Sequence, residues 1–251
     1  MQFGFGSTQI NVNIANSAML LATVLARFRA HQGFALATIN LDHLVKLQTS
    51  DTFRAAYAAQ DLVVADGHPI VWLSRLAGRP VSLVPGSDMV RPLARAAAKA
   101  GVGVAFVGST EASLAAAAKQ LMIDAPGLNV VLRVAPAMGF DPQSEAAASI
   151  LADLAARGAG LCFVALGAPK QEAFAARGRL LAPSVGFASV GAGLDFIAGS
   201  QTRAPIWVRR MALEWLWRAL TNPARLFPRY VACALILPSQ IRAALRLRYS
   251  A

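Results

Sequence analysis

The 251-residue chain is poor in acidic residues and in the side chains that bind metals. It has 13 Asp and Glu against 24 Lys and Arg, and only three His and two Cys. Cys162 and Cys233 lack metal-ligand spacing, and no HExxH, CxxC or DxD motif is present. Both cysteines stand among apolar residues, as is typical of buried thiols in a reducing compartment. We therefore expect no dedicated metal site.

Two nucleotide-binding motifs and two targeting signals are also missing. No GxGxxG follows the first expected strand and no Walker Lys-Ser/Thr pair occurs, which disfavours a nicotinamide-dependent dehydrogenase. Residues 1–16 do not read as a secretory signal. No apolar run reaches the roughly 18–20 residues that a membrane-spanning helix needs. We expect a protein that is cytosolic or held at a membrane face.

The chain does have many apolar residues, 56% of the total, in an alternating pattern of strands and helices. Such alternation predicts an α/β fold with a mainly parallel, Rossmann-like sheet covered by helices on both faces. Residues 1–16 predict a short hairpin or strand. The predicted strands are Phe34–Asn40, Leu62–Ala65, Val102–Val107, Asn129–Val134, Leu161–Leu166 and Gly186–Val190. The predicted helices are Ala18–Ala30, Ser87–Ala100, Glu111–Ile123, Ser144–Ala156 and Ala173–Leu181.

Positive charge is concentrated near the C-terminus. The net charge is +11, which favours an anionic partner: nucleic acid, a membrane surface or a phosphorylated substrate. From Arg203 onward the chain has nine arginines and one acid, Glu214, interleaved with tryptophans and aliphatic residues. This pattern predicts basic amphipathic helices that lie in a membrane interface. We expect a catalytic domain at 1–202 and a membrane-associating helical appendage at 203–251.

Two alternatives for the C-terminal segment remain open. It is also compatible with an ordinary helical cap whose tryptophans pack on the sheet. Nucleic acid is the less favoured partner, because the aliphatic run Val231–Leu237 suits a lipid interface better than a phosphate backbone.

The segment Gly167–Glu172 is the most informative motif. It joins a strand to a helix, and ligands of open parallel sheets bind beyond the carboxyl ends of the strands. Free N–H groups at a helix N-terminus attract phosphate. Lys170 adds a charge, Gln171 a two-way hydrogen-bonding amide and Glu172 an acceptor. The alternative is a plain capped turn.

Polar residues also follow two other predicted strands. Thr38 and Asn40 stand at the end of one and are candidates for ligand contact. Asp42 is placed to cap the next helix, and His43 is expected to be partly buried there. Asp66, followed by Gly67, is placed as a general base, although Asp-Gly steps are also common in turns.

Two further segments carry polar groups near expected helix starts. In Pro85–Asp88, a tight turn opens a helix, with Ser87 expected as its N-cap. In Gly191–Phe196, two glycines permit close backbone approach, and Asp195 is a candidate acceptor for a sugar hydroxyl.

Together, these segments resemble the WecG/TagA/CpsF family of bacterial glycosyltransferases from about residue 8 to about residue 232. The motifs that carry the resemblance are Thr38-Ile39-Asn40-x-Asp42, Asp66-Gly67 with Val71-Trp72, Pro85–Asp88, Gly167–Glu172, Gly193-x-Asp195-Phe196, Arg203-Ala204-Pro205, Glu214-Trp215-Leu216 and Pro223-x-Arg225. The resemblance implies inverting, metal-independent transfer from a UDP-sugar to a polyprenyl-diphosphate-linked saccharide. It also implies a cytoplasmic membrane location, a docking C-terminal appendage and possible homo-oligomers.

The resemblance also implies roles for individual residues. Asp66 matches the general base, and Thr38 beside it positions a substrate. Gln171 and Asp195 match positions near the nucleotide, supported by Lys170 and Glu172. The leaving diphosphate would be neutralised by arginines of the appendage, for which the candidates are Arg203, Arg210 and Arg218. The competing hypothesis is a non-enzymatic basic protein that binds membranes or nucleic acid, and the joint presence of Asp66 and Gly167–Glu172 disfavours it.

Overall fold

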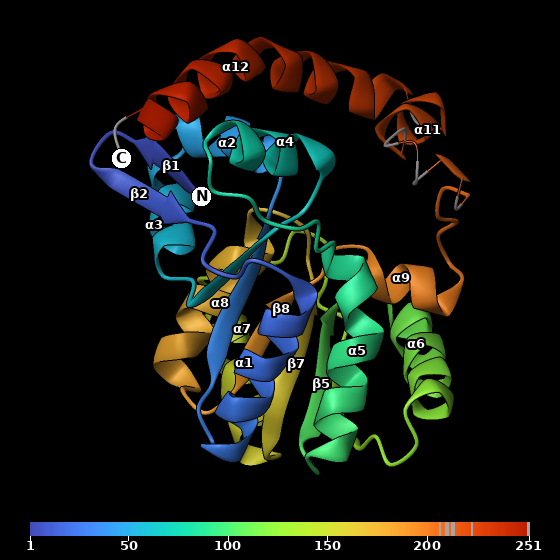
Figure 1. Cartoon of the computed structure of the whole chain (residues 1–251). Coiled ribbons are helices and arrows are strands. Elements are labelled where there is room, and N and C mark those ends of the chain that lie inside the picture. Colours follow the sequence, from blue (N-terminus) through green and yellow to red (C-terminus); the bar gives the residue numbers. More distant parts are fainter. Residues whose placement is uncertain (206, 209–210, 212–213, 222, 250–251) are drawn as a thin grey trace.

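The computed structural model describes residues 1–205, 207–208, 211, 214–221 and 223–249, without the side chains of residues 218, 219, 221 and 225. Figure 1 shows a central sheet with helices on both faces and a long C-terminal helix that arches over one end. The six strands of the sheet are parallel and follow the order β4-β3-β8-β7-β5-β6. Their bounds are β3 Phe34–Ile39, β4 Leu62–Ala65, β5 Gly103–Gly108, β6 Val130–Val134, β7 Ala159–Ala165 and β8 Gly186–Ser189.

The predicted α/β fold is confirmed, and the ends of the predicted strands lie within one or two residues of the observed ones. The predicted N-terminal hairpin is also present: β1 (Gln2–Phe5) pairs antiparallel with β2 (Thr8–Asn11). The apolar strand segments could be located because both faces of a parallel sheet are buried, which requires continuous apolar runs.

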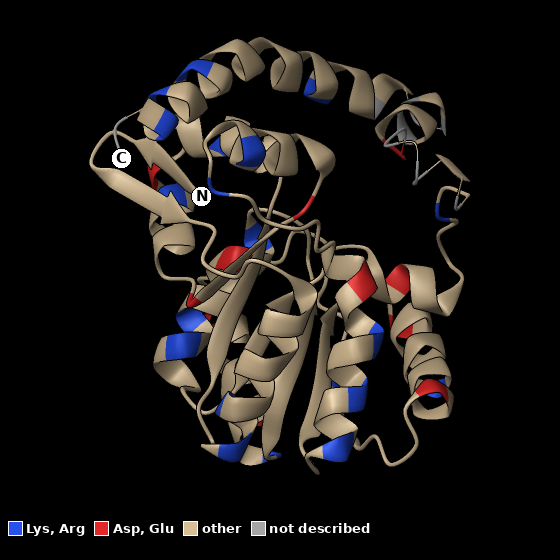
Figure 2. Ribbon diagram, in the orientation of Figure 1, with Lys and Arg blue, Asp and Glu red and all other residues tan. Residues whose placement is uncertain are grey.

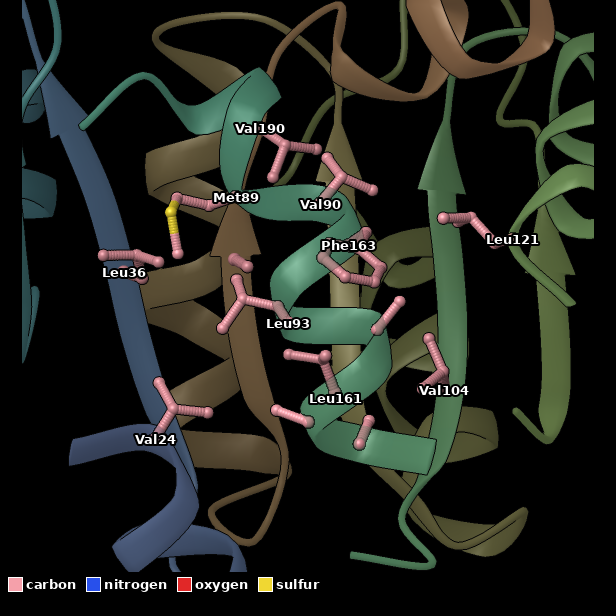
Figure 3. Close-up of a cluster of buried hydrophobic side chains, with 14 of the residues drawn as sticks. Val24, Leu36, Met89, Val90, Leu93, Val104, Leu121, Leu161, Phe163 and Val190 are labelled. Atoms are coloured by element: carbon pink, nitrogen blue, oxygen red, sulfur yellow. The ribbon is translucent and has the colours of Figure 1, made fainter. Parts of the chain in front are cut away.

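Helices cover the two faces of the sheet in separate groups. On one face lie α1 (Ser17–Arg29), α5 (Gly86–Lys99), α6 (Glu111–Asp124) and α9 (Gly193–Ala198). On the other lie α3 (Asp51–Ala58), α7 (Glu145–Ala156) and α8 (Lys170–Leu181). Figure 3 shows the first core, where Leu36 and Phe163 from the strands meet Met89 and Leu93 from α5.

Two predicted helix caps are wrong. The helix α2 (Leu41–Thr49) is capped by Asn40, whose Oδ1 accepts from the His43 N–H at 3.0 Å, while Asp42 lies inside the first turn. The helix α5 begins at Gly86 with Pro85 at the capping position, so Ser87 is not the N-cap. A Cβ on Gly86 would lie 3.0 Å from the Thr38 side chain and 3.2 Å from the Ser189 carbonyl oxygen, so this close contact with β3 and β8 determines where α5 begins.

The C-terminal part contains α11 (Glu214–Thr221) and α12 (Pro223–Tyr249). The helix α12 packs on α2 and on α4 (His68–Leu76), with Cys233 and Ala244 buried, and Arg229 pairs with Asp42 at 3.0 Å. The side chains of Trp207 and Trp215 are 62% and 50% exposed, so neither of them packs on the sheet. For these two tryptophans, the alternative of a helical cap that packs on the sheet is wrong.

One expectation about the membrane needs correction. Among the described residues, the part of α12 from Leu226 to Tyr249 is long and apolar enough to cross a bilayer, judged by length and composition alone. The sequence shows no uninterrupted apolar run here, because arginines stand near both ends of this helix. The helix α12 packs on α2 and α4 with one side, as a helix that lies along the surface of the molecule does.

Candidate active site

Three of the predicted site residues meet at the carboxyl ends of β3 and β4. Thr38 pairs with Val64 in the parallel register, and the Asp66 N–H donates to the Ile39 carbonyl at 2.7 Å. This places Asp66 close to Asn40, which directly follows the neighbouring strand β3. Thr38 is buried beneath them, at 5% exposure, while Asn40 and Asp66 are partly exposed. The expected proximity of Thr38 and Asp66 agrees with this geometry.

The loop that joins β7 to α8 differs from the expected polar turn. The helix begins at Lys170, three residues earlier than predicted, and Gln171 and Glu172 are buried inside its first turn at 3% and 0% exposure. Gln171 Nε2 donates to Glu172 Oε1 at 2.9 Å, and Gln171 Oε1 accepts from the Gly191 N–H at 3.2 Å. The side chains of Gln171 and Glu172 therefore form hydrogen bonds within the protein. Of the three polar residues in this motif, only Lys170 is partly exposed.

A buried polar cluster lies behind this loop. His43 Nδ1 and the Tyr57 hydroxyl are 2.9 Å apart, and Gln60 Nε2 donates to the Glu172 carbonyl at 3.1 Å. Burial lowers the pKa of His43 to about 3, so its ring is neutral, and burial raises the pKa of Tyr57 well above its usual value. His43 is thus a buried core residue, at 4% exposure, where partial burial was expected.

Asp195 is held by side chains from two other segments. Its Oδ1 accepts from the Ser109 hydroxyl, and its Oδ2 accepts from Gln201 Nε2 at 2.9 Å. Ser109 has a left-handed backbone, with φ 52°, directly after Gly108 at φ 121°. Ser109 was not among the predicted site residues. The sequence pattern that could have identified Ser109 is Gly-Ser-Thr at the end of an apolar strand. Asp66-Gly67 occupies the corresponding position after β4.

Arg203 reaches the same edge of the sheet from the segment after α9. Its guanidinium forms an ion pair with Asp88 in the first turn of α5 and lies 5.7 Å from the centre of the Phe196 ring. Burial opposes a rise in the pKa of Arg203, but the hydrogen bond and charge of Asp88 raise it, with smaller contributions from Glu214 and Asp66. Figure 2 shows acidic residues gathered at the starts of α5 and α9, on this edge. Arg210 and the side chain of Arg218 lie outside the described residues.

The geometry suits acid-base chemistry beside an anionic leaving group. Asp66 supplies a carboxylate, Thr38 a hydroxyl and Arg203 a cation, while Gly167 and Gly191 leave room for close approach to the backbone. In the described part of the chain, no group of three His, Cys, Asp or Glu side chains could hold a metal ion. A depression of about 520 Å³ that includes Arg27, Gly33 and Arg179 lies at the start of β3, away from Asp66.

The fold and this edge define a Rossmann-like α/β protein with a carboxylate-centred site at the ends of its parallel strands. The model of the glycosyl transferase WecG/TagA/CpsF family matches residues 7–250, so the chain belongs to that family. A similar protein is the N-acetylglucosaminyldiphosphoundecaprenol N-acetyl-beta-D-mannosaminyltransferase of Bacillus spizizenii (strain ATCC 23059 / NRRL B-14472 / W23). The two are 29% identical over 212 residues, which cover 82% of this chain and 80% of the relative. The chain is therefore a glycosyltransferase, as the resemblance of its motifs indicated.

Proposed function

We propose that the protein transfers a sugar from a UDP-sugar to a polyprenyl-diphosphate-linked saccharide, with inversion and without a metal. The observation that carries this proposal is the grouping of Asp66, Thr38 and Asn40 at adjacent strand ends, with Arg203 reaching the same edge. The name of the Bacillus relative supports the acceptor part of the proposal, since it names N-acetylglucosaminyldiphosphoundecaprenol as the acceptor of an N-acetyl-beta-D-mannosaminyl group.

The reaction needs one proton transfer and one displacement. Asp66 takes the proton from the acceptor hydroxyl as that oxygen attacks the anomeric carbon of the donor. Attack from the face opposite UDP forms the new glycosidic bond, breaks the bond between the sugar and UDP, and inverts the anomeric centre. Thr38 orients the reacting sugar by its hydroxyl. UDP then leaves with the bonding electron pair.

The leaving diphosphate needs positive charge, and Arg203 is the described candidate for supplying it. Arg203 pairs with Asp88, so diphosphate binding would exchange one anionic partner of Arg203 for another. Lys170 is partly exposed in the first turn of α8 and adds charge near the same edge. Gln171 and Glu172 are buried and act through the Gly191 N–H that Gln171 holds, whereas partly exposed Asp195 remains a candidate for direct contact with the nucleotide.

Binding of UDP tests this proposal. Calorimetry in the presence of EDTA, with NAD and ATP as comparison ligands, should show selective binding of UDP. Gln171→Ala should weaken it about tenfold, because the Gly191 N–H loses its acceptor. EDTA should likewise leave the rate of sugar transfer unchanged. Binding of NAD in preference to UDP, or a strict Mg²⁺ requirement for transfer, would contradict the proposal, and binding of no nucleotide would favour the non-enzymatic hypothesis.

We also infer that the protein is peripheral at the cytoplasmic membrane face and docks through α12. Phe227, Val231 and Leu235 recur every four residues, each is exposed, and they form one stripe along the helix. Exposed Arg242, Arg246 and Arg248 on the same helix suit anionic headgroups. Homo-oligomer formation stays a prediction that the resemblance supports.

Replacing this stripe should release the protein from membranes. The triple variant Phe227→Ser, Val231→Ser, Leu235→Ser should lose about tenfold or more in affinity for anionic vesicles, because about three large apolar contacts disappear. These side chains are exposed, so the fold should persist. The matched control is Met122→Ser with Ile123→Ser, which removes exposed apolar residues from α6. Sedimentation of the triple variant with vesicles at the wild-type level would rule out docking through this stripe.

A further inference from the structure

Glu172 is an unusual residue to find inside a protein. It is 0% exposed, and its Oε2 has no hydrogen-bond partner among the described residues. A buried carboxyl group with an unpaired oxygen costs free energy, and an apolar side chain of similar size would avoid that cost. Packing alone therefore does not explain a glutamate here.

The other oxygen of Glu172 makes a specific contact. Oε1 accepts from Gln171 Nε2, and Gln171 Oε1 in turn accepts from the Gly191 N–H. An amide side chain has one donating and one accepting end, and a backbone N–H can only donate. Because Glu172 draws the NH₂ group toward itself, the carbonyl oxygen of Gln171 must face Gly191. Glu172 thus fixes the orientation of the amide.

Gly191 opens the short segment between β8 and α9, and its φ of 54° is left-handed. This segment lies between Val190, whose N–H donates to the Val164 carbonyl, and Gly193, which packs against Val90 and Ser87 of α5. The Gly191 N–H donates to the Gln171 side chain, so the amide of Gln171 ties this segment to α8.

We propose that Glu172 is a positioning residue: by orienting the Gln171 amide, it holds the Gly191–Gly193 segment in the conformation that receives the UDP-sugar donor. We name the chain of contacts Glu172 Oε1, Gln171 amide and Gly191 N–H the amide relay. The donor part of this inference rests on the proposed function, whereas the effect on the segment does not.

The surroundings of Glu172 fit this role. Lys46 and Asp42 of α2 act on it electrostatically, Glu172 in turn acts on Tyr57 of α3, and Gln60 Nε2 donates to the Glu172 carbonyl. Burial raises the pKa of Glu172 to about 7. In either protonation state a carbonyl-type oxygen remains to accept from Gln171, so the relay persists across neutral pH.

The first test measures amide hydrogen exchange of Gly191 in the unliganded protein. Glu172→Leu removes the acceptor, so protection of the Gly191 N–H should fall by roughly tenfold. Glu172→Gln keeps an acceptor oxygen and should stay within about threefold of wild type. The control Leu151→Ala, a buried residue of α7, should lower global stability without a selective effect on Gly191. Unchanged exchange in Glu172→Leu would overturn the relay, whatever the protein binds.

The second test measures UDP affinity and transfer in the same variants. Glu172→Leu should weaken UDP binding about tenfold and raise KM for the donor, while kcat stays within about threefold. In a Gln171→Ala background, Glu172→Leu should have no further effect, because both substitutions break one relay. Additive effects would show that Glu172 acts independently of Gln171, against the proposal. If the exchange responds but wild type does not bind UDP, the relay stands and the proposed function fails.

Discussion

Asp66→Asn should reduce the rate of sugar transfer by about a thousandfold while leaving UDP affinity within about threefold of wild type. The amide is nearly the same shape as the carboxylate but cannot accept a proton at neutral pH. Asp66 lies at the carboxyl end of β4, next to Asn40 and within electrostatic reach of Arg203. The loss should therefore fall on kcat, because the acceptor hydroxyl remains protonated as it attacks.

Transfer to a lipid-linked acceptor, UDP calorimetry and thermal unfolding together separate the possible roles of Asp66. The matched control is Asp153→Asn, which makes the same chemical change at an exposed position of α7 and should leave all three unchanged. If Asp66→Asn abolished UDP binding along with transfer, Asp66 would be a nucleotide ligand rather than the base. If it lowered the unfolding temperature strongly, a structural role would be the better account.

Gly108→Ala should destabilise the fold by about 3 kcal/mol or more. Gly108 ends β5 with a φ of 121°, which L-residues rarely adopt, and an added Cβ would lie 2.3 Å from the Ala165 carbonyl oxygen of β7. The obstacle is backbone in the middle of the sheet and cannot move aside as a side chain would. Urea unfolding, with the midpoint and slope measured separately, gives the loss directly.

The control for Gly108 is Gly127→Ala. Gly127 also has a positive φ, 85°, but nothing lies within 4 Å of its added Cβ, so only the conformational cost remains, about 1 kcal/mol. The difference between the two variants isolates the contact with β7. Equal losses would show that β5 and β7 can separate locally. Because Ser109 follows Gly108 and bonds Asp195, any Gly108→Ala protein that folds should also bind UDP more weakly.

The sequence predicted the parts of the site that depend on local pattern. Asp66, Thr38 and Asn40 follow buried apolar runs, and parallel strands bring their carboxyl ends to one edge, so their proximity followed from the strands alone. The same reasoning failed for Gln171 and Glu172, which were expected in a polar turn but are buried. Their partners include Gly191, 20 positions away, and no local pattern reveals such a contact.

The helix starts illustrate the same limit. Ser87 and Asp42 are good capping residues by type, yet tertiary contacts decided otherwise. Gly86 must approach Thr38 and Ser189 closely, and Asp42 pairs with Lys46 and with Arg229 of α12. The pairing of Arg203 with Asp88 joins residues 115 positions apart. Apart from the Asp42–Lys46 pair, which lies within α2, these contacts join segments far apart in the sequence, and the alternating pattern does not place such segments relative to one another.

That strand order also has a consequence for biosynthesis. The strand β8 lies between β3 and β7, and so divides the first strands made from those that follow. While the chain is still emerging from the ribosome, β3 and β4 can pair with each other, but the edge of β3 that faces β8 has no partner until residues 186–189 appear. Asp66 is therefore synthesised well before the Gly191 segment and Arg203, which lie at the same edge of the sheet. A nascent chain shorter than about four fifths of the protein lacks Arg203, so the candidate site is complete only shortly before α12 is synthesised.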